Sequence, residues 1–123
     1  MAIKKILVVD DSPTEALFLS EILGKNGFKV TVAADSDQAM GKLEAEAFDL
    51  ILMDVVMPGQ NGYQATRAIK KDDRFKDIPV IMCTTKGLET DRVWGMRQGA
   101  KAYITKPFTD AQLTEAIQGA LGG

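Results

Sequence analysis

Five apolar runs that alternate with five amphipathic stretches predict an α/β fold: a doubly wound, five-stranded parallel sheet with helices on both faces. The connections between these segments are only a few residues long, as is usual in such folds. Most of the runs are continuously apolar, which is typical of strands buried on both sides. We expect the crossovers between parallel strands to be right-handed.

The first two strands and the first two helices have clear local signals. Residues 5–9 are a short apolar run, and residues 28–33 alternate apolar with polar side chains. Between them, Ser12-Pro13-Thr14-Glu15 is a capping box with proline at the first helical position, and Asn26-Gly27 ends the helix. The second helix opens at Asp35. Its predicted apolar side is Ala39, Met40, Leu43 and Ala47.

The central strand, Leu50–Met53, ends at Asp54 and is followed by the chain breaker Pro58-Gly59. Both features indicate a buried strand that gives way to a loop at its carboxyl end. The remaining expected elements are a helix over 63–71, a strand over 79–83, a helix over 89–98, a strand over 102–104, and a last helix that opens with the capping box of residues 109–112 and runs through Leu121.

Composition excludes several classes of function. The chain contains no histidine, so histidine-based catalytic triads and imidazole zinc sites are excluded. A net charge of −2 gives no basic field for nucleic acid or for an anionic membrane, and the apolar runs are too short to span one. The single cysteine, Cys83, lies among apolar residues and is expected to be a buried, inert thiol in a reducing compartment.

Polar residues follow four of the predicted strands at their carboxyl ends, where doubly wound sheets place their sites. Each of these residues alone is also explained as an ordinary turn or strand residue. Their coincidence at four strand ends favours a single site. In this site a divalent cation would relieve the repulsion between the carboxylates. The lysine and a threonine hydroxyl would face a phosphoryl group. The residues are Asp10, Asp11, Asp54, Thr84, Thr85 and Lys106.

Four segments together resemble the receiver domain of two-component response regulators, which has a flavodoxin/CheY-like fold. They are Val8–Ser12, Met53–Gly59, Thr84–Lys86 and Tyr103–Phe108. The resemblance covers essentially the whole chain, residues 1–123, and implies a stand-alone receiver without an output domain. Within the family, the stretches around Ser12 and Glu89–Lys101 are most similar to the PilH-type regulators of type IV pilus (twitching) chemosensory systems.

The resemblance implies a role for each residue that matches the family motif. Asp54 would accept a phosphoryl group from the phosphohistidine of a CheA-like kinase. Mg²⁺ would be held by Asp11, Asp54 and the backbone carbonyl of Val56, with Asp10 acting through water. The phosphoryl oxygens would be bound by Lys106, by the Thr84 hydroxyl and by backbone N–H groups near Val56 and Thr85.

The same resemblance implies a switch and a lifetime for the phosphorylated state. Thr84 would move inward, Tyr103 would become buried, and the face formed by the fourth helix, fifth strand and fifth helix would change. Val56 and Lys86 stand where a side chain would orient the hydrolytic water, and neither can accept its proton. Together with the bulk of Thr85, this predicts slow self-dephosphorylation. Lys106-Pro107 is expected to be cis.

Three other functions were weighed against the receiver. An aspartyl phosphatase of the haloacid dehalogenase type needs a second acid where Val56 stands. A flavodoxin-like cofactor module needs a phosphate-binding loop where Asp10-Asp11 would repel phosphate. A docking domain that works unphosphorylated would not need the complete acid set.

The expected partners are the kinase and a downstream motility or pilus protein, and neither nucleic acid nor a membrane is expected to bind. The chain is expected to be a cytoplasmic monomer. It would catalyse only its own phosphorylation and dephosphorylation. It would either switch a target or act as a phosphate sink for a kinase that is shared with another receiver. The single tryptophan, Trp94, is expected to fill a core or groove position rather than to anchor a partner.

Overall fold

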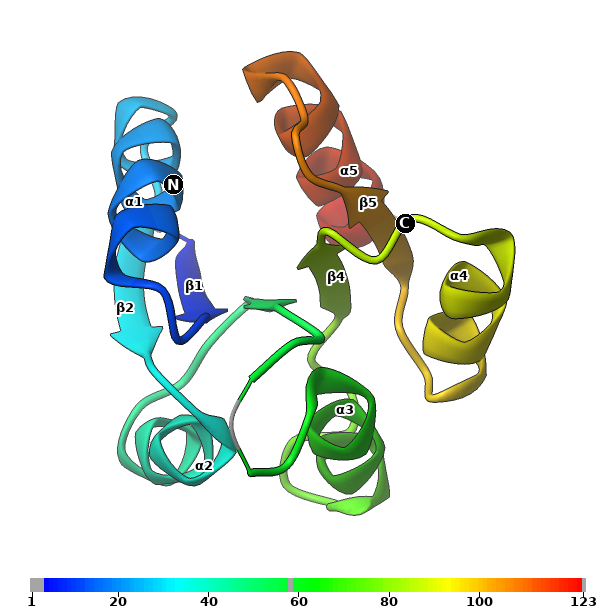
Figure 1. Cartoon of the computed structure of the whole chain (residues 1–123). Coiled ribbons are helices and arrows are strands. Elements are labelled where there is room, and N and C mark those ends of the chain that lie inside the picture. Colours follow the sequence, from blue (N-terminus) through cyan, green and yellow to red (C-terminus); the bar gives the residue numbers. More distant parts are fainter. Residues whose placement is uncertain (1–3, 58, 123) are drawn as a thin grey trace.

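The computed structural model describes residues 4–57 and 59–122 and confirms the predicted α/β fold (Figure 1). All strand pairs are parallel, and the spatial order β2-β1-β3-β4-β5 puts β3 at the centre of the sheet. The strands are β1 (Lys5–Val9), β2 (Lys29–Ala33), β3 (Leu50–Met53), β4 (Val80–Thr84) and β5 (Ala102–Thr105). The helices are α1 (Pro13–Lys25), α2 (Ser36–Ala45), α3 (Gly62–Lys71), α4 (Glu89–Arg97) and α5 (Asp110–Gly122).

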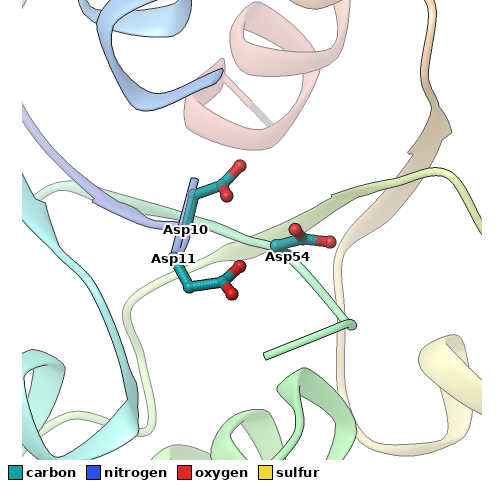
Figure 2. Close-up of side chains that lie close together, drawn as sticks. All are labelled: Asp10, Asp11 and Asp54. Carbon is teal, nitrogen blue, oxygen red and sulfur yellow. The ribbon is translucent and has the colours of Figure 1, made fainter. Parts of the chain in front are cut away.

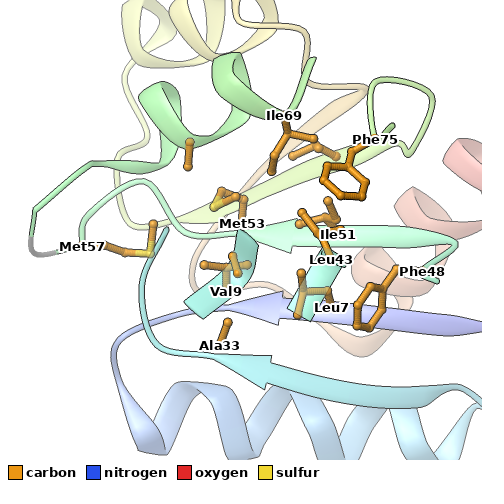
Figure 3. Close-up of a cluster of buried hydrophobic side chains, with 13 residues drawn as sticks. Leu7, Val9, Ala33, Leu43, Phe48, Ile51, Met53, Met57, Ile69 and Phe75 are labelled. Atoms are coloured by element: carbon orange, nitrogen blue, oxygen red, sulfur yellow. The ribbon is translucent and has the colours of Figure 1, made fainter. Parts of the chain in front are cut away.

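Two hydrophobic clusters, one on each face of the sheet, hold the layers together. Successive strand residues point to opposite faces, so a continuously apolar strand contributes to both clusters. Leu7, Val9, Ile51 and Met53 pack with side chains from α2 and α3 (Figure 3). Their sequence neighbours Ile6, Val8, Leu50 and Leu52 pack with side chains from α1 and α5. The expectation that the central strands are buried on both faces is therefore confirmed.

The helix starts follow from local hydrogen bonds. The Ser12 hydroxyl accepts from the Glu15 backbone N–H at 3.3 Å, which caps α1 as predicted. The start of α3 was not predicted in full: Asn61 and Gln64 form a reciprocal capping box, so the helix begins at Gly62. Gly62 is required there, because a Cβ atom would lie 2.1 Å from the Asp54 carbonyl oxygen. This close approach ties α3 to the end of β3.

One packing prediction is wrong: Ala47 lies beyond the end of α2 and is exposed, because the helix stops at Ala45. Of the two places predicted for Trp94, a core or a groove position, the structure supports the groove. Trp94 is 49% exposed on α4, a helix whose only buried residue among those described is Gly95, and it lines a groove between α3 and α4. Element ends otherwise differ from the predictions by a few residues. The cis Lys106–Pro107 bond is confirmed, and no helix in the described part of the chain has the length and apolar character to cross a membrane.

Candidate functional site

Three carboxylates meet at the carboxyl edge of the sheet (Figure 2). One oxygen from each of Asp10, Asp11 and Asp54 lies within 4.8 Å of the others. The parallel ladder places them: the Asp10 N–H donates to the Ala33 carbonyl at 3.0 Å, and the Asp54 N–H donates to the Val9 carbonyl at 2.9 Å. Asp10 is buried, Asp54 is half-buried and Asp11 is exposed, so the cluster opens to solvent on the Asp11 side.

Lys106 is the cation that faces these acids. Its Nζ donates to Asp10 Oδ2 at 2.9 Å and lies 3.7 Å from Asp54 Oδ2 and 3.8 Å from Glu15 Oε2. The Lys106 N–H also donates to the Thr84 carbonyl at 2.8 Å, which fixes the backbone beside β4. The sequence reasoning missed Glu15 as a neighbour of the site, although it had recognised this residue as part of the capping box of α1. The structure thus holds the lysine closest to Asp10 rather than to Asp54.

Burial disfavours the charged forms of Asp54 and Lys106, and the charges around each group change its pKa further. Desolvation raises the pKa of Asp54, the negative charge of Asp10 raises it further, and Lys106 only partly offsets both. Burial alone would lower the pKa of Lys106, but its hydrogen bond with Asp10 and the charges of Asp54 and Glu15 leave that pKa above its ordinary value. The carboxylates therefore gain from any additional cation, while the lysine stays charged.

The remaining predicted site residues lie around this cluster. Thr84 is buried, and its hydroxyl accepts from the Lys86 N–H at 3.3 Å. The Val56 N–H donates to Asp54 Oδ1 at 3.3 Å, whereas the Val56 side chain is 52% exposed. Thr85 and Lys86 are exposed at the end of β4. Cys83 is buried as predicted, and burial raises its thiol pKa to about 12, which makes it inert.

Tyr103 connects the site region to α4. Its hydroxyl donates to the Lys86 carbonyl at 2.6 Å, and its half-buried ring packs against Gly95, where an added Cβ would lie 2.9 Å from Tyr103 Cδ2. Tyr63 on α3 makes a second link, which the sequence reasoning missed: its hydroxyl donates to the Asp91 carbonyl in the first turn of α4 at 3.0 Å. Two tyrosine hydroxyls therefore hold the amino end of α4 through backbone carbonyls.

The donor set fits Mg²⁺. Oxygens of the three carboxylates lie within 4.8 Å of one another, and charged oxygen ligands are the kind that Mg²⁺ prefers. Lys106 is a single cation facing three carboxylates, so it does not neutralise them alone. A hard cation with oxygen ligands is the species that this arrangement can hold.

Comparison with known proteins agrees with this geometry. The family model for the response regulator receiver domain matches residues 6–118. The chain belongs to this family. It is 48% identical to the protein PilH of Pseudomonas aeruginosa over 119 residues, which cover 97% of this chain and 98% of PilH.

Solved receiver structures share the fold over nearly their full length. The chemotaxis protein CheY4 of Vibrio cholerae superposes with a TM-score of 0.91 at 32% identity, covering 98% of this chain and 100% of CheY4. The receiver domain of a sensor histidine kinase of Pseudomonas aeruginosa gives a TM-score of 0.90 at 34% identity, covering 99% of this chain and 100% of that domain. That structure has a magnesium ion coordinated in its active site cleft. The chain is thus a CheY-like receiver similar to PilH.

Proposed function

We propose that this receiver accepts a phosphoryl group on Asp54 from the phosphohistidine of a CheA-like kinase and passes the signal on through α4, β5 and α5. The observation that supports this most directly is the convergence of Asp10, Asp11, Asp54 and Lys106 at one edge of the sheet. Asp54 is the acid at the end of the central strand, and desolvation by burial raises its pKa.

The metal would be held by Asp11, Asp54 and the Val56 carbonyl, with the buried Asp10 acting through water. When bound, Mg²⁺ neutralises charge on the carboxylates and on the phosphoryl oxygens. Asp10 already accepts a hydrogen bond from Lys106, so it is less available as a direct ligand than the exposed Asp11. Both residues keep the site acidic enough to require a cation.

The chain's own residues would then guide the transfer. An Asp54 Oδ atom attacks phosphorus, the P–N bond to the donor imidazole breaks, and the electron pair remains on that nitrogen. Lys106 lies 3.7 Å from Asp54 Oδ2 and would turn from Asp10 toward the phosphoryl oxygens, while the Val56 N–H, which now donates to Asp54, would donate to the same group. The Thr84 hydroxyl and the N–H of Thr85 would complete the contacts.

The phosphorylated state would be read at α4. Movement of Thr84 toward the phosphoryl group frees space beside β4, and Tyr103 is the half-buried aromatic that would fill it. Because the Tyr103 hydroxyl is bonded to Lys86, two residues beyond Thr84, displacement of this loop alters the contact of Tyr103 with α4. The similarity to PilH suggests a role in pilus or chemotaxis-type motility control, with a motility protein as the downstream partner.

The kinase would dock beside Lys106. Leu17 and Phe18 on α1 are 61% and 46% exposed, and a cavity of about 480 Å³ between α1 and the loop after β5 is lined in part by Phe18, Pro107 and Phe108. An apolar surface of this kind next to the phosphoryl site suits the phosphodonor domain of a kinase. Its position would bring a donor imidazole to the open side of Asp54.

The decisive test is Asp54→Asn. We expect Mg²⁺-dependent labelling by acetyl phosphate or by a phosphohistidine donor to be lost, while circular dichroism shows a folded protein. Asp49→Asn is the matched control, because Asp49 lies at the opposite end of β3, where it accepts from the Lys5 N–H. Full labelling of Asp54→Asn would assign the phosphoryl group to another residue, and loss of labelling in both variants would show that the effect is structural.

The lifetime of the phosphoryl group is expected to depend on Val56. Its exposed side chain offers no donor or acceptor to hold the attacking water, so self-dephosphorylation should be slow. Val56→Asn should accelerate phosphoryl loss several-fold in excess Mg²⁺, since general assistance to a water is typically worth this much or more. Decay at the wild-type rate, or more slowly, would remove Val56 from the explanation of lifetime.

A further inference from the structure

A groove between α3 and α4 combines the single tryptophan of the chain with a cluster of cations. Its volume is about 290 Å³. The lining residues are Arg67, Lys70, Lys71, Trp94, Arg97 and Gln98. None of these six is acidic, although the whole chain has 17 acids and 15 cations. The groove is a locally positive site on a protein of net charge −2, and neither the receiver fold nor the proposed phosphotransfer uses it.

Helix geometry makes this groove compact. Residues three and four apart lie on the same face of a helix, and each helix contributes one such triplet. The triplet of α3 is Arg67, Lys70 and Lys71, and that of α4 is Trp94, Arg97 and Gln98. Each triplet spans about one helical turn, roughly 5 Å along the axis. A groove of this length matches one small molecule better than a partner helix, which would need several turns of contact.

The cations of the groove do not stabilise the fold through ion pairs or through favourable spacing on their helix. Arg67 and Lys71 are like charges at positions i and i+4, an arrangement that destabilises a helix. Other surface cations, such as Arg74 and Arg92, form ion pairs with nearby acids. In the ranges 4–57 and 59–122, none of the four groove cations has a carboxylate oxygen within 4.0 Å. Concentrated positive charge with no carboxylate in direct contact favours binding of an anion.

Lys70 forms the floor of the groove and is not available to a ligand. Its Nζ donates to the carbonyls of Lys76 and Ile78, at 3.1 and 2.5 Å, and burial lowers its pKa despite the nearby charge of Asp77. Its aliphatic stem lies against Gly99, where a Cβ would come within 2.8 Å of Lys70 Cγ. The exposed cations Arg67, Lys71 and Arg97 are left to face the ligand.

Trp94 supplies a flat apolar surface next to these cations. It is half-exposed, and Gln98 Nε2 donates to the Trp94 carbonyl at 3.2 Å. Indole rings stack on planar heterocycles, and nucleobases are the commonest such rings. A ring stacked on Trp94 would place an attached phosphate chain beside Arg97 and across from Arg67.

We propose that the α3–α4 groove binds a small planar organic phosphate of the nucleoside di- or triphosphate class, with its ring on Trp94 and its phosphates on Arg67, Lys71 and Arg97. This site is separate from the carboxylates at the sheet edge and does not depend on phosphorylation of Asp54. The end of a nucleic acid strand offers the same chemistry, but the length of one helical turn fits a free nucleotide.

The test is titration with ADP and GDP in the presence of EDTA, so that metal-bridged binding at the acidic crevice is removed. Because Trp94 is the only tryptophan, its fluorescence reports directly on the groove. We expect saturable quenching, with adenosine and pyrophosphate each binding at least about tenfold more weakly than ADP, since each makes only half of the contacts. Affinity should fall as salt concentration rises.

Variants locate the site. Arg67→Gln and Arg97→Gln should each weaken ADP binding by about tenfold, the usual effect of losing one charge-assisted hydrogen bond. Trp94→Ala should do the same when binding is measured by calorimetry. Lys25→Gln is the matched control: Lys25 is an exposed lysine at the end of α1, a helix that packs on the opposite face of the sheet.

Several outcomes would overturn the proposal. No quenching and no heat at millimolar ADP and GDP would show that the groove takes no nucleotide. Pyrophosphate binding as tightly as ADP would reduce it to a general anion site, and equal losses in Lys25→Gln would reduce it to overall charge. A thymidine oligonucleotide that binds much more tightly than any mononucleotide would assign the groove to a nucleic acid strand.

Discussion

The helices α3 and α4 pack on the same face of the sheet next to each other, yet they are held in different ways (Figure 1). α3 buries Gly62, Ala65, Thr66 and Ile69, and its apolar side joins the cluster shared with α2. α4 buries only Gly95, while Val93 and Trp94 are 40% and 49% exposed. Buried apolar side chains hold α3 in place. α4 is held by the close contact at Gly95 and by two tyrosine hydrogen bonds.

This difference suits a signalling domain. Elements that move in a conformational switch come from the less stable part of a structure, where little apolar surface is buried. α3 follows directly from the loop after Asp54 and keeps that strand end in place through the hydrogen bond from the Gly62 N–H to the Val55 carbonyl, at 2.9 Å. α4 covers only the small cluster of Val55, Met82 and Ala100 and buries little apolar surface of its own, so a small movement near Thr84 can change its position.

The largest expected effect comes from truncating the core side of α3. Ile69→Ala should lower the free energy of unfolding by about 2–5 kcal/mol, because the buried Ile69 side chain leaves a cavity against β3. Val93→Ala on α4 is the comparison and should cost less than about 0.5 kcal/mol. Urea denaturation measures both. Similar losses in the two variants would mean that α4 is held as firmly as α3.

Gly95→Ala tests the one close contact of α4. An added Cβ would lie 2.8 Å from Met82 Sδ and 2.9 Å from Tyr103 Cδ2, so α4, the Met82 side chain or the Tyr103 ring must shift. We expect a net loss of about 1 kcal/mol, the cost of overpacking less the better helix propensity of alanine. Gly41→Ala on α2 is the control: nothing lies within 4 Å of its Cβ position, and it should stabilise the protein by roughly 0.5–1 kcal/mol.

The Gly95 variant also reports on the link to Tyr103. If the ring moves, the hydrogen bond from the Tyr103 hydroxyl to the Lys86 carbonyl should weaken, and NMR signals at Lys86 and Gly87 should shift. If α4 moves instead, the shifts should centre on Asp91 and its contact with Tyr63. Unchanged spectra at both places would show that the Met82 side chain makes room for the added methyl group while α4 and the Tyr103 ring stay in place.

The sequence allowed the fold to be predicted because its signals are local. Continuous apolar runs marked β1, β3 and β4, and the cap at Ser12 marked the start of α1. The cluster of Asp10, Asp11 and Asp54 could also be predicted, since parallel strands bring their carboxyl ends to one edge. These features depend on periodicity and topology, which a sequence contains directly.

Other features depend on three-dimensional packing and could not be predicted. The 2.9 Å bond between Lys106 and Asp10, rather than Asp54, follows from how the loop after β5 meets the end of β1 at the carboxyl edge of the sheet. The sequence could not decide whether Trp94 fills the core or a groove, because tryptophan is usually buried and the spacing of apolar residues in α4 does not reveal how little of that helix is covered. The tyrosine bonds to Lys86 and Asp91 join segments with no sequence pattern in common.

The smallest expected effect is also the sharpest test of how α4 is held. Removing a buried tryptophan typically costs about 3–5 kcal/mol, because a large apolar surface is lost and a cavity remains. Trp94 is half-exposed and lines an open groove, so Trp94→Ala leaves no closed cavity and removes only partial contact with the stems on α3. We therefore expect a loss of less than about 1 kcal/mol in urea denaturation. Because the variant lacks tryptophan fluorescence, the transition should be followed by circular dichroism for both proteins. A loss of 3 kcal/mol or more, on the scale of a core truncation, would mean that Trp94 is the main anchor of α4, and the contrast with α3 would then be wrong.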